Sequence, residues 1–195
     1  MNINIFGSTG NIGSKTLDII KDNFSEINVN LLCANNNVNK LIEQVNLHSP
    51  KYVYINNSNK INILKKNIAS KVIILNFNEL ISYLDNSKSD LSILAISGYK
   101  SLNYFEPILK NTSSLGLVSK ETVVSAGHLF KKFNQFIKKK IYPLDSEHFS
   151  IFQNINCNFS KLQNIIITAS GGPFLGRKYN SLKNISFAKA SKHPK

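Results

Sequence analysis

The sequence has few of the features that mark membrane, secreted or disulfide-bonded proteins. Its two cysteines, Cys33 and Cys157, give no disulfide framework and suit a reducing cytosol. No stretch approaches the roughly 20 consecutive apolar residues of a membrane span. The N-terminus, MNINIFGSTG, lacks a basic region, an apolar run and a cleavage site, and is typical of a folded strand. We therefore expect a cytoplasmic chain with no membrane partner. Its 195 residues suit one domain, or one domain and part of another.

Acidic residues are also scarce: 11 Asp and Glu stand against 24 Lys and Arg, for a formal net charge of +13. The basic residues are almost all lysines, with Arg177 as the single arginine, and they are scattered. The cluster Lys138-Lys139-Lys140 ends a predicted helix, where cations oppose the helix dipole. This distribution favours a solvated basic surface that attracts phosphorylated anions over a nucleic-acid interface.

Strand-like and helix-like segments alternate at least five times along the chain. Strands are predicted at 2–6, 27–34, 51–55, 71–75, 91–96 and 114–118, and the clearest helices at 11–24, 39–47 and 121–138. Such alternation implies right-handed parallel crossovers, and hence a doubly wound, mostly parallel, Rossmann-like α/β sheet. The alternation becomes less regular after about residue 143. We therefore predict one domain over 1–143 and the start of a second over 144–195.

A glycine-rich stretch, GSTGNIG, joins the first predicted strand to the first predicted helix. Gly7 permits a sharp turn, Gly10 lets backbone N–H groups approach a pyrophosphate, and Gly13 lets the helix pack near the strand. The position between a strand and a helix favours dinucleotide binding over an ordinary turn. The predicted cofactor loop comprises Gly7, Ser8, Thr9, Gly10, Asn11, Ile12 and Gly13.

The end of the second predicted strand bears on the choice of dinucleotide. NAD-specific sites usually carry Asp or Glu there for the ribose 2′-hydroxyl. This chain instead has Asn35, Asn36 and Asn37, with Lys40 as the nearest cation. Because no acidic side chain stands there to repel a 2′-phosphate, the sequence favours NADP over NAD. The alternative is a simple polar turn.

Two carboxylates, Asp145 and Glu147, stand two residues apart in PLDSEHFSIFQ. If the chain is extended there, they point to one side and converge on a hard cation such as Mg²⁺ or Mn²⁺. The alternative is a helix start, with Asp145 as the cap and Glu147 favouring the dipole. The spacing alone favours the helix start, and His148 alone is more often structural than a ligand.

Two further stretches carry polar groups at places where ligands bind. In TASGGPF (168–174), Ser170 and two glycines form an open backbone suited to phosphate, or simply a turn before Pro173. In LVSKET (117–122), Lys120 and Glu121 follow a predicted strand, where doubly wound folds place ligands. Their alternative is an exposed pair that opens a helix.

Taken in order, GSTGNIGSKTLDII, LVSKETVVSAG, PLDSEHFSIFQ, TASGGPF and KHPK closely resemble the 1-deoxy-D-xylulose 5-phosphate reductoisomerase family over the whole chain. The resemblance implies NADPH- and divalent-metal-dependent isomerisation and reduction of 1-deoxy-D-xylulose 5-phosphate to 2-C-methyl-D-erythritol 4-phosphate, in non-mevalonate isoprenoid biosynthesis. It also implies a small phosphorylated sugar as substrate, a homodimer, and an α+β catalytic domain that starts at about residue 144.

The resemblance also implies roles for individual residues. Asp145 and Glu147 match two metal carboxylates, and Lys120 and Glu147 match catalytic groups. The implied substrate contacts are Lys120, Ser146, Glu147, Ser170 and His193. The implied cofactor contacts add Asn35, Asn36, Asn37, Ser119 and Glu121 to the glycine loop.

The chain departs from the family pattern in three places. Ser119 stands where the family usually has asparagine, and Asn35-Asn36-Asn37 stands where it often has Gly-Lys-Asn, so we expect weak to moderate NADPH binding. The sequence stops at Lys195, just after the HP motif. We therefore expect an N-terminal portion with little or no turnover by itself, whose residues Ile165, Ile166 and Ile167 are exposed and reduce solubility.

Three other interpretations compete. An NADP-dependent dehydrogenase resembling aspartate-semialdehyde dehydrogenase needs a nucleophilic cysteine at a strand–helix junction, whereas Cys33 lies inside a predicted strand and Cys157 has no evident base nearby. A non-catalytic dinucleotide-binding module and a nucleic-acid binder are the two others.

Overall fold

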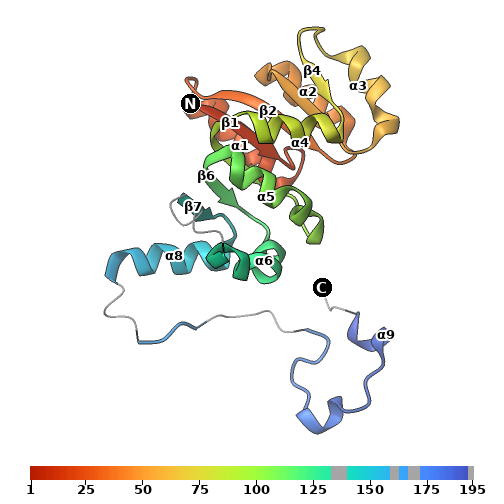
Figure 1. Cartoon of the computed structure of the whole chain (residues 1–195). Helices are drawn as coiled ribbons and strands as arrows, with labels where there is room; N and C mark the ends of the chain where they lie inside the picture. The colour runs from red at the N-terminus through yellow and green to blue at the C-terminus, as the bar shows by residue number, and fades with distance from the viewer. Residues whose placement is uncertain (133–139, 159–162, 167–171, 193–195) are drawn as a thin grey trace. The chain divides into compact units, whose positions relative to one another are not determined.

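Seven parallel strands form one sheet in the computed structural model, which describes residues 1–132, 140–158, 163–166 and 172–192 (Figure 1). The strands are β1 Asn2–Phe6, β2 Asn28–Ala34, β3 Tyr52–Ile55, β4 Ile73–Leu75, β5 Ser89–Leu94, β6 Thr112–Leu117 and β7 Lys140–Pro143. Their order is β4-β3-β2-β1-β5-β6-β7, and every neighbouring pair is parallel. The predicted Rossmann-like α/β fold is confirmed.

The helices cover both faces of this sheet. The chain forms α1 Asn11–Asn23, α2 Val38–His48, α3 Ile61–Asn67, α4 Phe77–Asn86, α5 Leu102–Asn111, α6 Lys120–Lys132 and α8 Ser146–Asn158, with 3-10 turns η1 Ser58–Lys60 and η2 Tyr99–Ser101. Buried residues of α1, α2 and α3 share one core cluster, and those of α4, α5 and α6 share the other. The sheet is therefore doubly wound.

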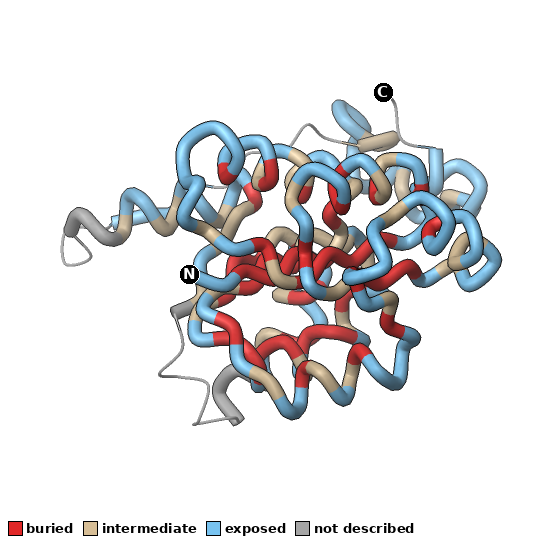
Figure 2. The backbone as a smooth tube through the Cα atoms, turned by 90° about the horizontal axis from the view of Figure 1, so that it is seen from above, coloured by how far each residue is buried: buried red, intermediate tan, exposed pale blue. Residues whose placement is uncertain are grey.

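Alternation along each strand explains the two cores. Leu31 and Cys33 of β2 belong to one cluster, whereas Leu32 and Ala34 belong to the other. Successive side chains of a strand point to opposite faces, so a strand buried on both faces is apolar at nearly every position. Figure 2 shows these buried positions gathered along the strands and on the inner sides of the helices.

The chain divides into two compact units, Met1–Gln153 and Asn154–Lys195. In the second, the described elements are the end of α8, the 3-10 turn η4 Tyr179–Leu182 and the short helix α9 Phe187–Ala190. Ile165 and Ile166 are exposed, as expected, and Ile167 lies outside the described residues. In the described part of the chain, residues 163–166 form neither a helix nor a strand.

In the described ranges, no helix is both long enough and apolar enough to cross a bilayer.

Candidate functional site

The loop after β1 turns in a way that only glycine permits. Gly7 has a φ of 84°, and a Cβ added there would lie 2.5 Å from the Ala95 carbonyl oxygen. The backbone N–H groups of Gly7 and Ser8 both donate to the Cys33 carbonyl, at 2.8 and 2.9 Å. The loop is thus hydrogen-bonded to the end of β2 and packs against Ala95, which follows β5. The sharp turn predicted at Gly7 is confirmed.

Gly13 lets α1 lie directly against this loop. A Cβ at Gly13 would collide with the Gly7 carbonyl and the Ser8 backbone. Helix α1 begins at Asn11 with Gly10 as its cap residue, and it has neither a side-chain cap nor an acid in its first turn. Its unpaired N–H groups and positive dipole end therefore fit a pyrophosphate.

A cavity of about 560 Å³ opens beside this helix start. It lies at the carboxyl ends of the strands, where β1 pairs with β2 on one side and β5 on the other, which is the switch point of the sheet. Its size is within the range of cofactor sites. The lining includes Gly7, Thr9, Gly10, Ala34, Asn35, Tyr54, Asn56, Ala95, Lys100 and Tyr104. The cavity thus fits a dinucleotide in both place and size.

The remaining residues of the predicted cofactor loop have different positions. Ser8 is fully buried, and its carbonyl accepts from the Gln44 amide at 2.8 Å, so it shapes the loop. Asn11 and Ile12 belong to the first turn of α1, where Asn11 is exposed.

The three asparagines after β2 do not share one role. Asn37 caps α2, because its side chain accepts from the Lys40 backbone at 3.2 Å. Asn35 and Asn36 instead accept from two asparagines that follow β3. Only Asn35 of the three lines the cavity.

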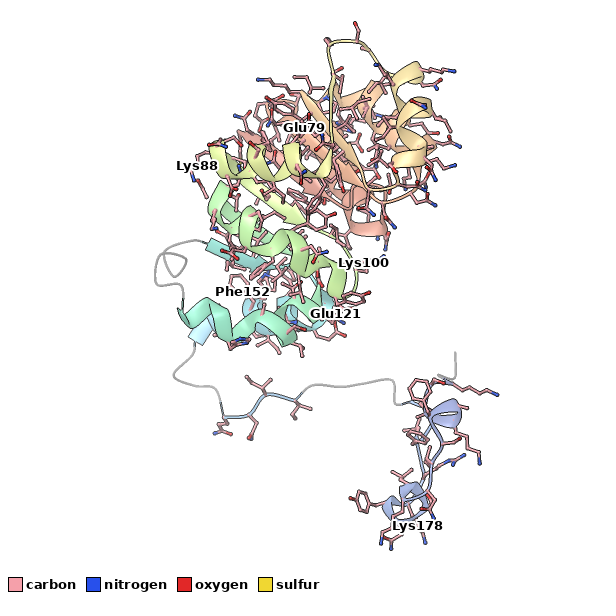
Figure 3. The ribbon with its side chains drawn as sticks, turned by 45° about the vertical axis from the view of Figure 1, so that its right-hand side comes forward. Glu79, Lys88, Lys100, Glu121, Phe152 and Lys178 are labelled. Atoms are coloured by element: carbon pink, nitrogen blue, oxygen red, sulfur yellow. The ribbon has the colours of Figure 1, made fainter. Side chains whose placement is uncertain are left out.

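Ser119 and Glu121 stand at the start of α6, just past the end of β6. Ser119 is buried, its hydroxyl accepts from the Thr122 backbone at 3.3 Å, and it donates to Glu121 at 3.1 Å. Hydrogen bonds from the Glu121 backbone and from Ser119 lower the pKa of the Glu121 carboxyl. Figure 3 shows Glu121 on helix α6.

Lys120 reaches the acidic segment predicted to bind metal. Its ammonium donates to Glu147 Oε1 at 2.6 Å, and the Ser146 hydroxyl donates to Glu147 Oε2 at 2.8 Å. These two bonds lower the pKa of Glu147 to about 2, and the same contact with Glu147 raises the pKa of Lys120. Both side chains are nearly half exposed. The pair therefore joins the ends of β6 and β7 without burying charge.

The segment 145–147 is not extended, so that premise of the metal prediction is wrong. Strand β7 ends at Pro143 and α8 begins at Ser146. Asp145, which is buried, accepts the His148 backbone N–H at 3.0 Å and contacts His148 Nδ1 at 2.8 Å. Asp145 is thus the cap of α8, because its carboxylate satisfies a backbone donor that the helix leaves unpaired.

The helix start still presents oxygen donors for a hard cation. Within the described ranges, no three His, Cys, Asp or Glu side chains lie together as a metal-binding group. Mg²⁺ commonly takes one or two carboxylates and completes its shell with water and substrate. Glu147 is the exposed carboxylate of such a set, and Asp145 would add the second from its cap position. A cation at Glu147 would compete with the Lys120 ammonium for Oε1.

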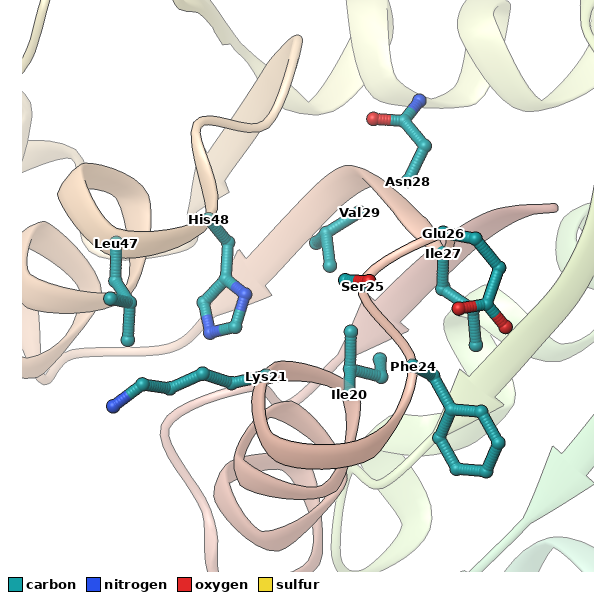
Figure 4. A pocket seen from close by; sticks show the side chains of 10 residues that line it. All are labelled: Ile20, Lys21, Phe24, Ser25, Glu26, Ile27, Asn28, Val29, Leu47 and His48. Carbon is teal, nitrogen blue, oxygen red and sulfur yellow. The ribbon is translucent and has the colours of Figure 1, made fainter.

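A second hollow, of about 370 Å³, lies at the opposite end of the sheet. Figure 4 shows Ile20, Phe24, Leu47 and His48 around it, close to the start of β2. Ligands of doubly wound sheets bind at the carboxyl ends of the strands. We therefore assign the site to the cavity beside Gly7.

Sequence reasoning missed Tyr54, Asn56 and Lys100, which also line the cavity. All three follow from the rule that ligands gather at carboxyl ends near the switch point, applied to β3 and β5 as well as β1. Ser170 and His193 lie outside the described residues.

The sheet and the cavity together define a class: a Rossmann-like α/β protein with a glycine loop at the switch point of a parallel sheet. A family model for 1-deoxy-D-xylulose 5-phosphate reductoisomerase matches residues 3–127, and one for the C-terminal domain of that enzyme matches 141–195. The chain belongs to the 1-deoxy-D-xylulose 5-phosphate reductoisomerase family, which confirms the resemblance.

Individual relatives agree with this assignment. The reductoisomerase of Pelagibacter ubique is 41% identical over 197 residues, covering 98% of this chain and 50% of the relative. A solved reductoisomerase from Zymomonas mobilis, in complex with NADPH, is 30% identical with a TM-score of 0.78, over 95% of this chain and 50% of that one. Another, in complex with NADPH, fosmidomycin and magnesium, is 26% identical with a TM-score of 0.76, over 100% and 51%. The chain spans about half the length of the curated relatives it matches.

Proposed function

We propose that this chain supplies the NADPH site and part of the metal and substrate site of a 1-deoxy-D-xylulose 5-phosphate reductoisomerase. The reaction is the isomerisation and reduction of 1-deoxy-D-xylulose 5-phosphate to 2-C-methyl-D-erythritol 4-phosphate, with NADPH and a divalent metal. The observation that carries the proposal is the Lys120–Glu147 contact. It brings the acidic start of α8 to the same carboxyl edge of the sheet as the glycine loop.

On the cofactor side, the loop from Gly7 to Gly13 and the start of α1 hold the pyrophosphate of NADPH, which supplies the hydride when bound. Asn35, Asn36 and Asn37 lie toward the adenosine end. Ser119 and Glu121 follow β6, on the β5–β6 side of the switch point, and we assign them to the cofactor on the family resemblance. Ser119 fixes the Glu121 carboxylate through its 3.1 Å bond.

On the substrate side, Asp145 and Glu147 hold Mg²⁺ or Mn²⁺, which acts as a Lewis acid and template when bound. The exposed Lys120 ammonium donates to Glu147 in this structure, and once a cation takes Glu147 it becomes a hydrogen-bond donor for substrate oxygen. The Ser146 hydroxyl is a second donor beside Glu147. Ser170 and His193 complete the proposed substrate contacts, with Ser170 on the substrate phosphate.

We propose a domain boundary near residue 143, which fits the second family model starting at residue 141. We also propose a homodimer in the cytoplasm, and we propose neither a nucleic acid nor a membrane as partner.

The first test is NADPH binding by the purified chain, followed by cofactor fluorescence. Asn11→Glu places an acid in the first turn of α1, where it suits the helix dipole but repels a pyrophosphate. We expect NADPH affinity to fall at least about tenfold. Asn62→Glu, an exposed first-turn position of α3, is the matched control and should leave binding unchanged. Equal binding by both variants would contradict the placement of the cofactor.

The second test is turnover. NADPH oxidation is measured with 1-deoxy-D-xylulose 5-phosphate and Mg²⁺, for this chain by itself and with the C-terminal half of the Pelagibacter ubique relative added. We expect activity that needs the added half and is abolished by Glu147→Gln. NADPH binding without turnover in either mixture would favour a non-catalytic dinucleotide-binding module.

The competing dehydrogenase mechanism needs a reactive cysteine. Burial raises the pKa of the Cys33 thiol well above its usual range, and Cys33 lies within β2. A thiol in that state is a poor nucleophile. Loss of activity on labelling Cys33 or Cys157 with a thiol reagent would support that mechanism instead. The nucleic-acid alternative predicts a steep salt dependence in a DNA titration.

A further inference from the structure

Amides, rather than charges, line the β2–β3 side of the cofactor cavity. Asn35 follows β2 and Asn56 follows β3, and both line it. Among the described residues of the lining, Lys100 is the one charged side chain. Lys100 belongs to the turn after β5, on the other side of β1 in the sheet. The lining at the end where a Rossmann-like fold places the adenosine ribose is therefore uncharged, and Lys40 of α2, outside it, is the cation nearest to Asn35 in sequence.

These amides are held in a defined orientation. The Tyr54 hydroxyl donates to Asn56 Oδ1 at 3.0 Å, and Asn56 Nδ2 donates to Asn35 Oδ1 at 3.0 Å. In parallel, Asn57 Nδ2 donates to Asn36 Oδ1 at 2.6 Å. Backbone bonds from Asn56 and Asn57 to the β2 end, both 2.9 Å, fix the two turns together. With its oxygen accepting from Asn56, Asn35, which lines the cavity, has its NH₂ group as the donor for a ligand, and Asn36 stands next to it outside the lining.

The hydrogen-bonding chemistry of an NH₂ group determines whether such a site can distinguish a ribose 2′-hydroxyl from a 2′-phosphate. A carboxylate at this place binds the ribose 2′-hydroxyl and repels a 2′-phosphate, whereas a guanidinium or ammonium pairs with the phosphate. A neutral NH₂ group donates to a hydroxyl oxygen and to a phosphate oxygen alike.

We propose that this chain contacts the cofactor ribose through Asn35, positioned by Asn56, and therefore discriminates only weakly between NADPH and NADH. The inference rests on the proposed dinucleotide site and concerns its specificity. NADH is thus a second cofactor for the same cleft.

The test is a pair of fluorescence titrations of the purified chain, without substrate, using NADPH and NADH at about 0.15 M salt, so that the general basic charge of the protein is screened. We expect the two dissociation constants to lie within about tenfold of each other. A larger preference for either cofactor overturns the proposal.

Charge substitutions locate the contact. Asn35→Asp should shift the preference toward NADH by at least about tenfold, and Asn36→Arg should shift it toward NADPH. Asn59→Asp is the matched control, since it adds the same charge in the neighbouring turn outside the two asparagine pairs. A shift in Asn35→Asp no larger than in Asn59→Asp would overturn the assignment of Asn35.

Two further outcomes distinguish a failure of this inference from a failure of the proposed function. A selective loss of NADPH affinity in Lys40→Gln would reveal an ammonium at the 2′ position and overturn weak discrimination, while leaving the reductoisomerase proposal intact. Binding of neither NADPH nor NADH would overturn the proposed function itself, and this inference with it.

Discussion

The glycine loop and the Lys120–Glu147 pair lie on the same edge of one sheet but are built differently. The loop is made of backbone in close contact, with no room for a Cβ at Gly7 or Gly13. The pair is made of exposed side chains that are 27 residues apart in sequence. Because the loop backbone is closely packed, a change that disturbs its conformation lowers the free energy of unfolding. Exposed charges fix little and remain free to exchange partners when a ligand arrives.

The largest expected effect comes from filling the loop. Gly7→Ala places a Cβ against Ala95 at a positive φ, so we expect a loss of about 3 kcal/mol in the free energy of unfolding. Urea denaturation measures it. Gly98 also has a positive φ but open space around it, so Gly98→Ala should cost about 1 kcal/mol. Equal losses in the two variants would show that the contact with Ala95 carries no energy.

The second prediction uses the exchange of partners at Glu147. Glu147→Gln should weaken Mn²⁺ binding at least about tenfold, because a carboxylate donor is lost. Lys120→Ala should strengthen it a few-fold in the cofactor-free chain, because the ammonium no longer competes for Oε1. Electron paramagnetic resonance of free Mn²⁺ gives both affinities. Weaker binding in Lys120→Ala would contradict the competition.

A smaller effect separates the two roles of Asp145, which is the cap of α8 and a proposed metal ligand. Asp145→Ala should cost about 1 kcal/mol of stability, whereas Asp145→Asn retains a good cap residue and should cost almost none. Both variants should weaken Mn²⁺ binding, because both remove the charge. Unchanged metal affinity in Asp145→Asn would leave Asp145 with the structural role alone.

The smallest effect is in pH dependence. The bonds from Lys120 and Ser146 lower the pKa of Glu147 to about 2, below the ordinary glutamate value. A lowered carboxylate pKa contributes stability above the ordinary value and loses it as pH falls toward about 2. Because the pair is exposed, the effect on unfolding should be slight. A carboxyl carbon NMR titration should show Glu147 charged where an isolated glutamate is protonated, and Lys120→Ala should raise its pKa.

Local sequence determined the framework of the protein. Short apolar strand segments, amphipathic helices and the GSTGNIG loop specify elements that form from neighbours in the chain, since the hydrophobic pattern and the backbone preference are local properties. The same holds for the glycines, whose need at Gly7 and Gly13 followed from a strand-to-helix turn. The sequence allowed both interpretations of Asp145, and the spacing favoured the helix start that the structure shows.

Tertiary structure decided which distant residues meet. Asn35 and Asn56 pair because β2 and β3 end side by side, and Lys120 meets Glu147 because β6 and β7 are neighbours. No spacing along the chain encodes those contacts, because the strand order β4-β3-β2-β1-β5-β6-β7 sets them. Likewise, Asp145 is the cap residue of α8 because the helix begins at Ser146. The physical reason is common to all three: parallel strands bring their carboxyl ends to one edge, and only packing chooses the neighbours there.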